Sequence, residues 1–332
     1  MYEYKNTATF VIPHFSEKED KLNILYLKEA IDGLFKQSDQ NWRAIIIDDK
    51  SRDPLTLSFL ANIKKEYYPK LDVIFMSENV GPGVCRNIGI LYAQKNNSPI
   101  ILFNDSDDIS HPYRLEIVRN IFESDRFIGL IYSTFNVINT QRTLVENEKI
   151  PIPIQEILKT HEADIVVEGY NTWIKMATES GYINKTSSTA VRTKFAIRCF
   201  FPAEYASEDY HTWLRLSAMG VKFKFAPGIP TFYRIPTGES QQASRIRIGA
   251  HEFNKIKIRV DADGFEKAVE IALAKDSIMP ENVYMLKAKF FKRQADFMKN
   301  FGENELSNLM LNKYFLYLKL NEYYSANGVV TA

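Results

Sequence analysis

Cysteine and net charge are both scarce in this sequence. Cys85 and Cys199 are the only cysteines among 332 residues, which leaves no disulfide framework and suits a reducing compartment. The formal net charge is only +1, so the chain has no overall positive field that would attract nucleic acid. We therefore predict neither a disulfide-stapled secreted domain nor a nucleic-acid partner.

The sequence also lacks long apolar runs. The longest, such as residues 127–132, have the length of a strand and are far too short to cross a membrane. Residues 1–6 lack the basic start and apolar stretch of a secretory signal peptide. We expect no transmembrane segment and a cytoplasmic location, and peripheral contact with the inner face of the cell membrane stays open.

Strand-like and helix-like segments alternate along the first part of the chain. The strand-like segments are short and apolar, whereas the segments between them have the apolar spacing of helices. This alternation predicts an α/β fold in which a mostly parallel sheet is flanked by helices on both faces. The predicted strands are residues 7–12, 43–47, 71–76, 99–103 and 127–132.

The second part of the chain gives a weaker pattern. Residues 135–200 show no clear periodicity, whereas residues 204–220 favour a helix and 221–225 a strand. Residues 237–244 are polar and are expected to be mobile. From Phe265 onward the apolar spacing again indicates helices.

The C-terminal region is predicted to hold a pair of helices, at 283–301 and 305–324, with Gly302 ending the first of them. We expect the two to form an antiparallel hairpin. Because 332 residues exceed what one core usually supports, we predict one large domain at 1–240 followed by a mobile loop and helical region at 241–332.

Two surface roles of this C-terminal region stay open. The helical hairpin is a candidate contact for a homo-oligomer. Lys289, Lys292 and Lys299 lie on one side of the first helix, opposite its apolar stripe. Such a basic side suits either a membrane surface or plain solvent.

An acidic cluster is the most informative local feature. The apolar run at residues 100–103 stops at a segment that carries Asp105, Asp107 and Asp108. Carboxylates crowded behind a buried strand repel and desolvate one another. A hard divalent ion such as Mg²⁺ or Mn²⁺, shared with a substrate phosphate, would neutralise them. The alternative is that Asp107 caps the helix that begins near Pro112.

Five motifs follow one another between residues 7 and 235. They are FVIPHF at 10–15, IIIDDKS at 45–51, NVGPGVCRNIG at 79–89, FNDSDD at 103–108 with Pro112 after it, and SEDYHTWLRL at 207–216. Their order resembles the family 2 glycosyltransferases with the GT-A fold. The resemblance implies a Rossmann-like sheet with a donor half at about 1–110 and an acceptor half at about 111–240.

The resemblance also implies a donor pocket. Asp49 would hydrogen-bond the nucleobase, and Pro13 and Phe15 would line the same pocket. Arg86 stands where the family has an arginine near the nucleotide. The alternatives are that Asp49 is a turn residue and that Arg86 is a helix-surface charge.

The catalytic groups are implied in the same way. Asp105-Ser106-Asp107 resembles the DxD motif, in which Asp105 would approach the ribose and Asp107 would bind the divalent metal. Both are candidate metal ligands. Asp209 matches the catalytic base of inverting members, with Glu208 beside it as a candidate acceptor contact. The alternative is that Glu208 and Asp209 are first-turn acids favoured by the helix dipole.

Three further residues are candidates. Arg245 ends a QASR segment that is similar to the QxxRW motif of processive members, but Ile246 replaces the tryptophan. We infer a non-processive enzyme in which Arg245 reaches the donor diphosphate when a mobile loop closes. Trp173 and Tyr182 either stack on an acceptor sugar or pack in the core. A second DxD, at 261–263, follows no apolar strand and is interpreted as a helix cap.

The function expected from these features is a metal-dependent, inverting glycosyltransferase. It would move a sugar from a nucleotide-diphosphate sugar, UDP by default, to a hydroxyl of a glycan, lipid-linked or other acceptor. The expected setting is bacterial surface polysaccharide or glycoconjugate synthesis. The alternative is a catalytically silent module that binds a nucleotide sugar or a partner.

Overall fold

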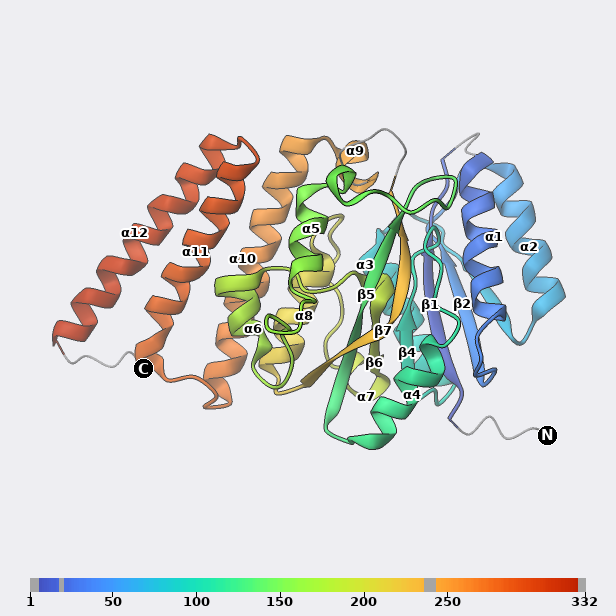
Figure 1. Cartoon of the computed structure of the whole chain (residues 1–332), viewed down its shortest axis with the longest axis horizontal. Coiled ribbons are helices and arrows are strands. Elements are labelled where there is room, and N and C mark those ends of the chain that lie inside the picture. Colours follow the sequence, from blue (N-terminus) through green and yellow to red (C-terminus); the bar gives the residue numbers. More distant parts are fainter. Residues whose placement is uncertain (1–5, 18–20, 236–242, 328–332) are drawn as a thin grey trace.

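A seven-stranded mixed sheet forms the centre of the molecule (Figure 1). The computed structural model describes residues 6–17, 21–235 and 243–327. The strand order is β3-β2-β1-β4-β6-β5-β7, and only β6 runs antiparallel to its neighbours. The strands are β1 (Ala8–His14), β2 (Trp42–Asp48), β3 (Leu71–Phe75), β4 (Ile100–Phe103), β5 (Ile128–Ile138), β6 (Thr189–Arg192) and β7 (Lys222–Arg234).

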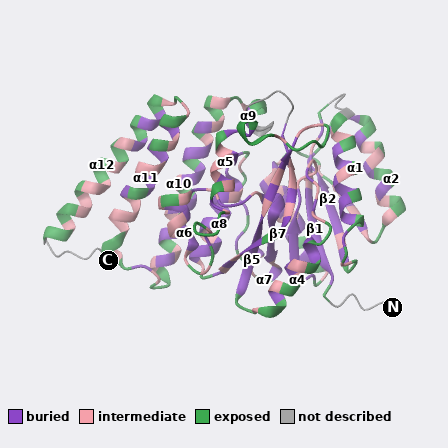
Figure 2. Cartoon of the chain, viewed as in Figure 1, coloured by how far each residue is buried: buried purple, intermediate pink, exposed green. Residues whose placement is uncertain are grey.

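Helices cover both faces of the sheet, as Figure 2 shows by the burial of the strands between them. The α-helices that come before residue 200 are α1 (Lys21–Phe35), α2 (Pro54–Tyr67), α3 (Pro82–Lys95), α4 (Arg114–Ser124), α5 (Ile152–Lys159), α6 (Thr172–Lys175) and α7 (Thr193–Ala196). Those that follow are α8 (Glu208–Ala218), α9 (Ala243–Ile248), α10 (Ala250–Ala274), α11 (Val283–Asn300) and α12 (Asn304–Asn327).

Alternation along the strands divides the core into two layers. In β1, Phe10 and Ile12 pack with residues of α1, α2 and α4, whereas Val11 packs on the other face with residues of α3, α8 and α10. Successive side chains of a strand point to opposite faces. A strand that is covered on both faces is therefore apolar throughout, which is why the sequence shows continuous rather than alternating apolar runs.

The sequence predicted the first five strands and the mostly parallel sheet correctly. It missed β6, which has only four residues and pairs antiparallel with β4 and β5. It also placed the end of the last strand at residue 225, whereas β7 runs on to Arg234 beside β5. The extension brings Arg234 to the carboxyl edge of the sheet.

The C-terminal helices lie on one side of the sheet, with α11 and α12 farthest from the N-terminus (Figure 1). The predicted hairpin is confirmed, because Phe291 of α11 stacks on Tyr317 of α12 with ring centroids 5.5 Å apart. The cap interpretation of residues 261–263 is wrong, since α10 begins at Ala250 and both aspartates lie inside it. No helix among the described residues is long and apolar enough to cross a membrane.

We expect that Gly89→Ala lowers the free energy of unfolding by about 1–3 kcal/mol, the usual cost of overpacking. A Cβ at Gly89 would overlap the side chain of Val11, because α3 packs closely on β1 at this point. Gly228→Ala is the matched control, since a Cβ there would meet nothing within 4 Å. Urea unfolding of both variants measures the difference, and equal midpoints would contradict the close packing.

Candidate active site

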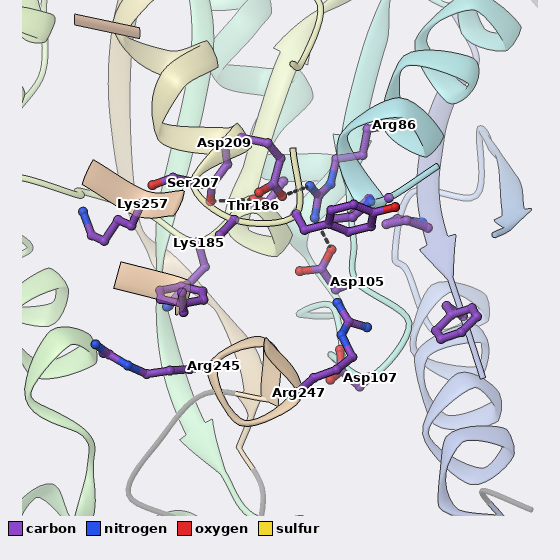
Figure 3. A pocket seen from close by; sticks show the side chains of 18 of the residues that line it. Arg86, Asp105, Asp107, Lys185, Thr186, Ser207, Asp209, Arg245, Arg247 and Lys257 are labelled. Atoms are coloured by element: carbon purple, nitrogen blue, oxygen red, sulfur yellow. Dashed lines mark hydrogen bonds and ion pairs between the residues drawn. The ribbon is translucent and has the colours of Figure 1, made fainter. Parts of the chain in front are cut away.

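A cavity of about 700 Å³ opens beyond the carboxyl ends of β1, β2 and β4 (Figure 3). This is the edge at which ligands bind in open α/β sheets. The helix α5, the end of β7, the N-terminus of α8 and the helices α9 to α11 also contribute to its lining. Of the predicted site residues, the cavity is lined by Pro13, Phe15, Asp49, Arg86, Asp105, Asp107, Tyr182, Glu208, Asp209 and Arg245.

Asp49 joins the end of β2 to the start of α3. Its Oδ1 accepts a hydrogen bond from the Val80 amide at 2.7 Å, and its Oδ2 accepts one from the Gly81 amide at 2.9 Å. Only 5% of the residue is exposed. Asp49 therefore connects two segments 31 or 32 residues apart in sequence, which a simple turn residue does not do.

Arg86 is a buried cation with two acidic partners. Its Nη2 lies 2.8 Å from Asp105 Oδ1 and its Nη1 lies 2.6 Å from Glu208 Oε1. The alternative of a helix-surface charge is wrong, because only 4% of Arg86 is exposed. Arg86 thus joins three segments at the cavity: α3, the segment after β4 and the first turn of α8.

Glu208, the second partner of Arg86, is a buried carboxylate. Burial, with the neighbouring charge of Asp209, raises the pKa of Glu208 to about 7, and the ion pair with Arg86 acts in the opposite direction. Its side chain contacts the Arg86 guanidinium, which keeps it close to the cavity.

The acidic segment after β4 divides into an outer and an inner part. Asp105 and Asp107 line the cavity, whereas Asp108 is buried and accepts a hydrogen bond from the Arg234 amide at 2.8 Å. Asp107 does not cap a helix, because α4 begins at Arg114 and no side chain caps it. Burial and the charge of Asp105 raise the pKa of Asp107 to about 6.

The donor set at Asp105 and Asp107 fits a hard cation that is shared with a substrate. Within the described residues, Asp107 forms no ion pair, and burial and the charge of Asp105 raise its pKa although the charge of Arg234 acts in the opposite direction. No group of three or more His, Cys, Asp and Glu side chains in the described part of the chain is arranged to hold a metal ion. The remaining ligands would have to be substrate oxygens or water, as is usual for Mg²⁺.

Asp209 lies in the first turn of α8 with part of its side chain accessible to the cavity. Its Oδ2 accepts a hydrogen bond from Thr186 Oγ1 at 3.0 Å, and its Oδ1 accepts one from the Tyr210 amide at 2.7 Å. These two contacts fix the orientation of the carboxylate. Its place at the helix start also agrees with the dipole interpretation, so the geometry is compatible with both.

The two aromatic candidates have different surroundings. Trp173 is fully buried, 6.1 Å from the ring of Phe265, and does not line the cavity. The prediction that it contacts an acceptor is therefore wrong, and it packs in the core instead. Tyr182 does line the cavity, where its ring stacks on Tyr210 at 4.4 Å and its hydroxyl bonds Ser207.

Arg245 lies in α9 and also lines the cavity. Its guanidinium donates a hydrogen bond to Asn254 and lies 4.6 Å from the ring of Phe301. Both contacts come from the C-terminal helices, which hold the arginine in place. Residues 237–242 of the segment predicted to be mobile lie outside the described residues. They include Gln242, the first residue of the QASR segment.

Several cations of the cavity were missed in the sequence, four of them in its second half and outside the sheet. Lys185 precedes the short turn at Thr186–Ser188, Arg247 lies in α9, Lys257 lies in α10 and Arg293 lies in α11. The only signal for any of them is the spacing of Lys257 and Asp261, which suits an ion pair within one helix. The motifs of the first 235 residues say nothing about side chains that the C-terminal helices contribute.

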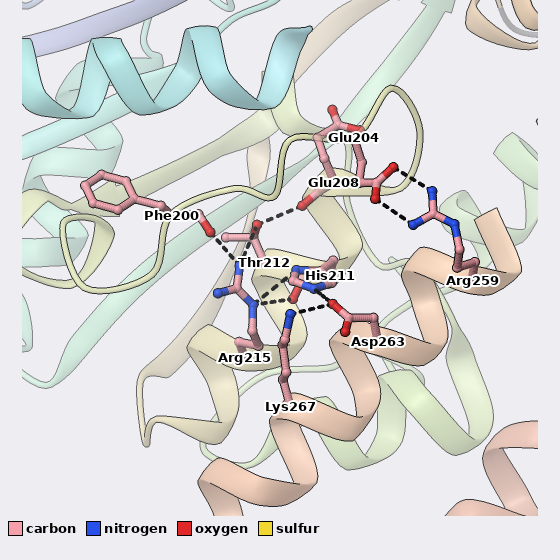
Figure 4. A network of polar contacts seen from close by, with 9 residues as sticks. All are labelled: Phe200, Glu204, Glu208, His211, Thr212, Arg215, Arg259, Asp263 and Lys267. Atoms are coloured by element: carbon pink, nitrogen blue, oxygen red, sulfur yellow. Dashed lines mark hydrogen bonds and ion pairs between the residues drawn. The ribbon is translucent and has the colours of Figure 1, made fainter. Parts of the chain in front are cut away.

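The helix that carries Asp209 and the segment before it contact α10 through polar side chains (Figure 4). His211 Nε2 lies 2.7 Å from Asp263 Oδ2, and Arg259 contacts both carboxylate oxygens of Glu204 at 2.7 and 2.8 Å. The helix α10 therefore contacts α8 at His211 and the preceding segment at Glu204, on either side of the first turn that lines the cavity.

The match to a family model decides the family. The model of glycosyl transferase family 2 matches residues 9–188, more than half of the chain. The chain belongs to glycosyl transferase family 2. The family 2 match contains Asp49, Arg86 and the acidic segment after β4, and it ends before α8.

Relatives of this family 2 chain cover it in part. An uncharacterised glycosyltransferase of Rickettsia felis is 33% identical over 119 residues, which are 36% of this chain and 18% of the relative. AmsB, the amylovoran biosynthesis glycosyltransferase of Erwinia amylovora, is 26% identical over 220 residues, 64% of each chain. The matched segment thus spans less than two thirds of either relative.

A solved structure covers nearly the whole chain. Residues 1–349 of TarS from S. aureus, in complex with UDP, align with a TM-score of 0.55 at 14% identity, covering 97% of this chain and 92% of that one. At this low identity the likeness concerns the fold alone. The fold is of the GT-A type, including the C-terminal helices.

Proposed function

We propose that this family 2 protein is a metal-dependent, inverting, non-processive glycosyltransferase. It transfers a sugar from a nucleotide-diphosphate sugar, with UDP as the nucleotide, to a hydroxyl of a glycan or lipid-linked acceptor. The observation that carries the proposal is a single cavity lined by Asp49, by Asp105 and Asp107, and by Asp209. The names of AmsB and of the UDP complex of TarS support polysaccharide synthesis and a UDP donor.

In this proposal the donor occupies the side of the cavity formed by the segments after β1, β2 and β4. Pro13 and Phe15 line the base pocket, and Asp49 shapes it by holding the backbone at Val80 and Gly81. Asp105, fixed by Arg86, faces the ribose.

Asp105 and Asp107 would hold the divalent ion together with donor oxygens. When bound, Mn²⁺ or Mg²⁺ supplies positive charge to the departing diphosphate. The chain itself supplies the base. Asp209, oriented by Thr186, accepts the proton of the acceptor hydroxyl as that oxygen attacks the sugar carbon from the face opposite the diphosphate. The anomeric configuration is thereby inverted without a covalent intermediate.

Incubation with UDP, GDP and dTDP sugars in the presence of Mn²⁺ tests the proposal. We expect one nucleotide sugar to release its nucleoside diphosphate, slowly onto water and faster onto a suitable acceptor, and chelation of the metal to stop both reactions. Tight donor binding with no release across a broad acceptor panel would favour the silent binding module instead. The anomer of the product, determined by NMR, tests inversion.

We expect that Asp107→Asn weakens donor binding in the presence of Mn²⁺ by about tenfold or more, because a charged ligand of a hard cation is lost. Titration of the nucleotide sugar with and without Mn²⁺ measures this effect. Asp164→Asn, which changes an exposed aspartate outside the cavity, is the control. If Asp107→Asn keeps the full stimulation by metal, the metal assignment is wrong.

A further inference from the structure

Three of the cations that line the cavity lie near Asp209 or on the helices α10 and α11, and two of them have no acidic partner within ion-pair distance among the described residues. Within the described residues, neither Lys185 nor Arg293 forms an ion pair with a carboxylate, although both line the cavity. Lys257 on α10 lies near Arg293 and is paired with Asp261. We call Lys185, Lys257 and Arg293 the cationic face.

Arg293 is held in a defined position. Its Nε donates a hydrogen bond to the carbonyl oxygen of Glu179 at 3.3 Å, which leaves its two Nη groups without acceptors among the described residues. The guanidinium passes directly over Gly181, where a Cβ would overlap Nη2. Gly181 also has a φ of +76°, a conformation that favours glycine. The backbone is therefore shaped to admit this arginine at the cavity.

Lys257 is held by a buried network that also reaches α8. Asp261 is fully buried, bonds Lys257 and Ser207, and accepts a hydrogen bond from Gln294 Nε2 at 3.0 Å. Ser207 immediately precedes α8, which carries Asp209. The carboxylate of Asp261 thus connects Lys257 of the cationic face to Ser207, which stands directly before the helix that carries Asp209.

Two residues of the cationic face, Lys185 and Lys257, lie close enough to Asp209 to feel its charge. The acidic groups that act on Lys185 are Asp209 first, then Asp108 and Asp105. Lys257 lies near Asp209 as well as near Arg293. In Figure 3, Lys185 and Lys257 lie toward Asp209 and Ser207, whereas Arg86 contacts Asp105 on the other side of the cavity.

We infer that the cationic face binds an anionic group of the acceptor, a phosphate or a carboxylate carried close to the hydroxyl that is glycosylated. The inference rests on the proposed function, because it takes the side of Asp105 and Asp107 as the donor site. Lys185 and Lys257, which lie near Asp209, and Arg293, which lies near Lys257, then belong to the acceptor side. An arginine with free Nη groups matches a phosphate or carboxylate by paired hydrogen bonds.

Burial disfavours the charged form of Lys185, and a bound anion would offset that cost. Burial lowers the pKa of Lys185 to about 8, although the surrounding carboxylates act to raise it. A bound anion replaces lost hydration and stabilises the charged form. A neutral acceptor would leave Lys185 and Arg293 without an anionic partner among the described residues.

Three sugars that share their hydroxyls at C2, C3 and C4 test the inference: methyl glucoside, methyl glucuronide, which carries a carboxylate at C6, and methyl glucoside 6-phosphate. We measure their binding to the protein by calorimetry in the presence of UDP and Mn²⁺. At least one anionic sugar should bind about tenfold more tightly than the neutral one, which corresponds to about 1.4 kcal/mol. The carboxylate and phosphate arms distinguish an acidic sugar from a phosphorylated one.

Charge removal at single positions locates the effect. Arg293→Gln and, independently, Lys185→Gln should abolish the preference for the anionic sugar. Lys289→Gln removes the same charge from an exposed position of α11 outside this cavity and should keep the preference. Equal binding of the three sugars, no binding of either anionic sugar, or a loss confined to UDP affinity would overturn the inference.

The two proposals fail in different ways. If no nucleotide sugar releases its nucleoside diphosphate, the glycosyltransferase proposal fails, whereas the binding comparison still reports on the anionic subsite. If release occurs but the anionic sugars gain nothing, the acceptor inference fails and the donor chemistry stands.

Discussion

Asp209→Asn is expected to lower kcat by roughly 10²–10⁴-fold, the usual contribution of a positioned general base. The amide keeps the shape of the side chain and can still contact Thr186 and the Tyr210 amide, but it cannot accept the proton of the acceptor hydroxyl. Donor affinity should stay close to that of the wild type, because the proposed donor contacts lie on the other side of the cavity. Steady-state transfer rates and donor titration measure the two quantities separately.

Two further variants sharpen this prediction. Thr186→Val removes the hydroxyl that donates to Asp209 Oδ2, so it should lower kcat by a smaller factor, about tenfold, the value of one hydrogen bond to a charged group. Asp164→Asn, at an exposed position outside the cavity, should change neither kcat nor donor affinity. Normal turnover with weakened donor binding in Asp209→Asn would assign this residue to the donor site instead.

The part of the fold that was predictable from the sequence is the part with local signals. Each of β1 to β4 is a short apolar run bounded by polar residues, and each following helix has a clear apolar stripe, so both periodicities are visible within a few residues. The acidic segment after β4 was also visible, because its three aspartates interrupt an apolar run. Parallel topology then brings the ends of β2 and β4 to the same edge.

What the sequence could not predict depends on contacts between distant segments. Arg86 and Glu208 are 122 positions apart, and nothing near either residue indicates that they pair. The cationic face is assembled from α10, α11 and the residue before a short turn, three segments with no shared motif. Trp173 was ambiguous for a different reason. An aromatic residue in a segment without periodicity suits a sugar contact or a core position equally well, and the structure places Trp173 in the core.

Arg86→Met is expected to lower the free energy of unfolding by about 3–5 kcal/mol, the usual cost of removing one partner of a buried ion pair. Methionine fills much of the arginine stem, so at about pH 8 the loss arises chiefly from Glu208, which has lost its cationic partner. The side chain of Glu208 is only 10% exposed, whereas that of Asp105 is 31% exposed and can be hydrated. Chemical denaturation of the variant measures the loss.

The pH dependence and a double variant test this cause. The folded pKa of Glu208 already lies above its ordinary value, at about 7, and removal of Arg86 would raise it further. A carboxyl with a raised folded pKa destabilises the fold as pH rises above its unfolded pKa, so the loss should be larger at about pH 8 than at about pH 6. Arg86→Met combined with Glu208→Gln should regain at least half of the loss, because no buried charge is then left unpaired. If the double variant is as unstable as the single one, the arginine stabilises this region by packing rather than by neutralising Glu208.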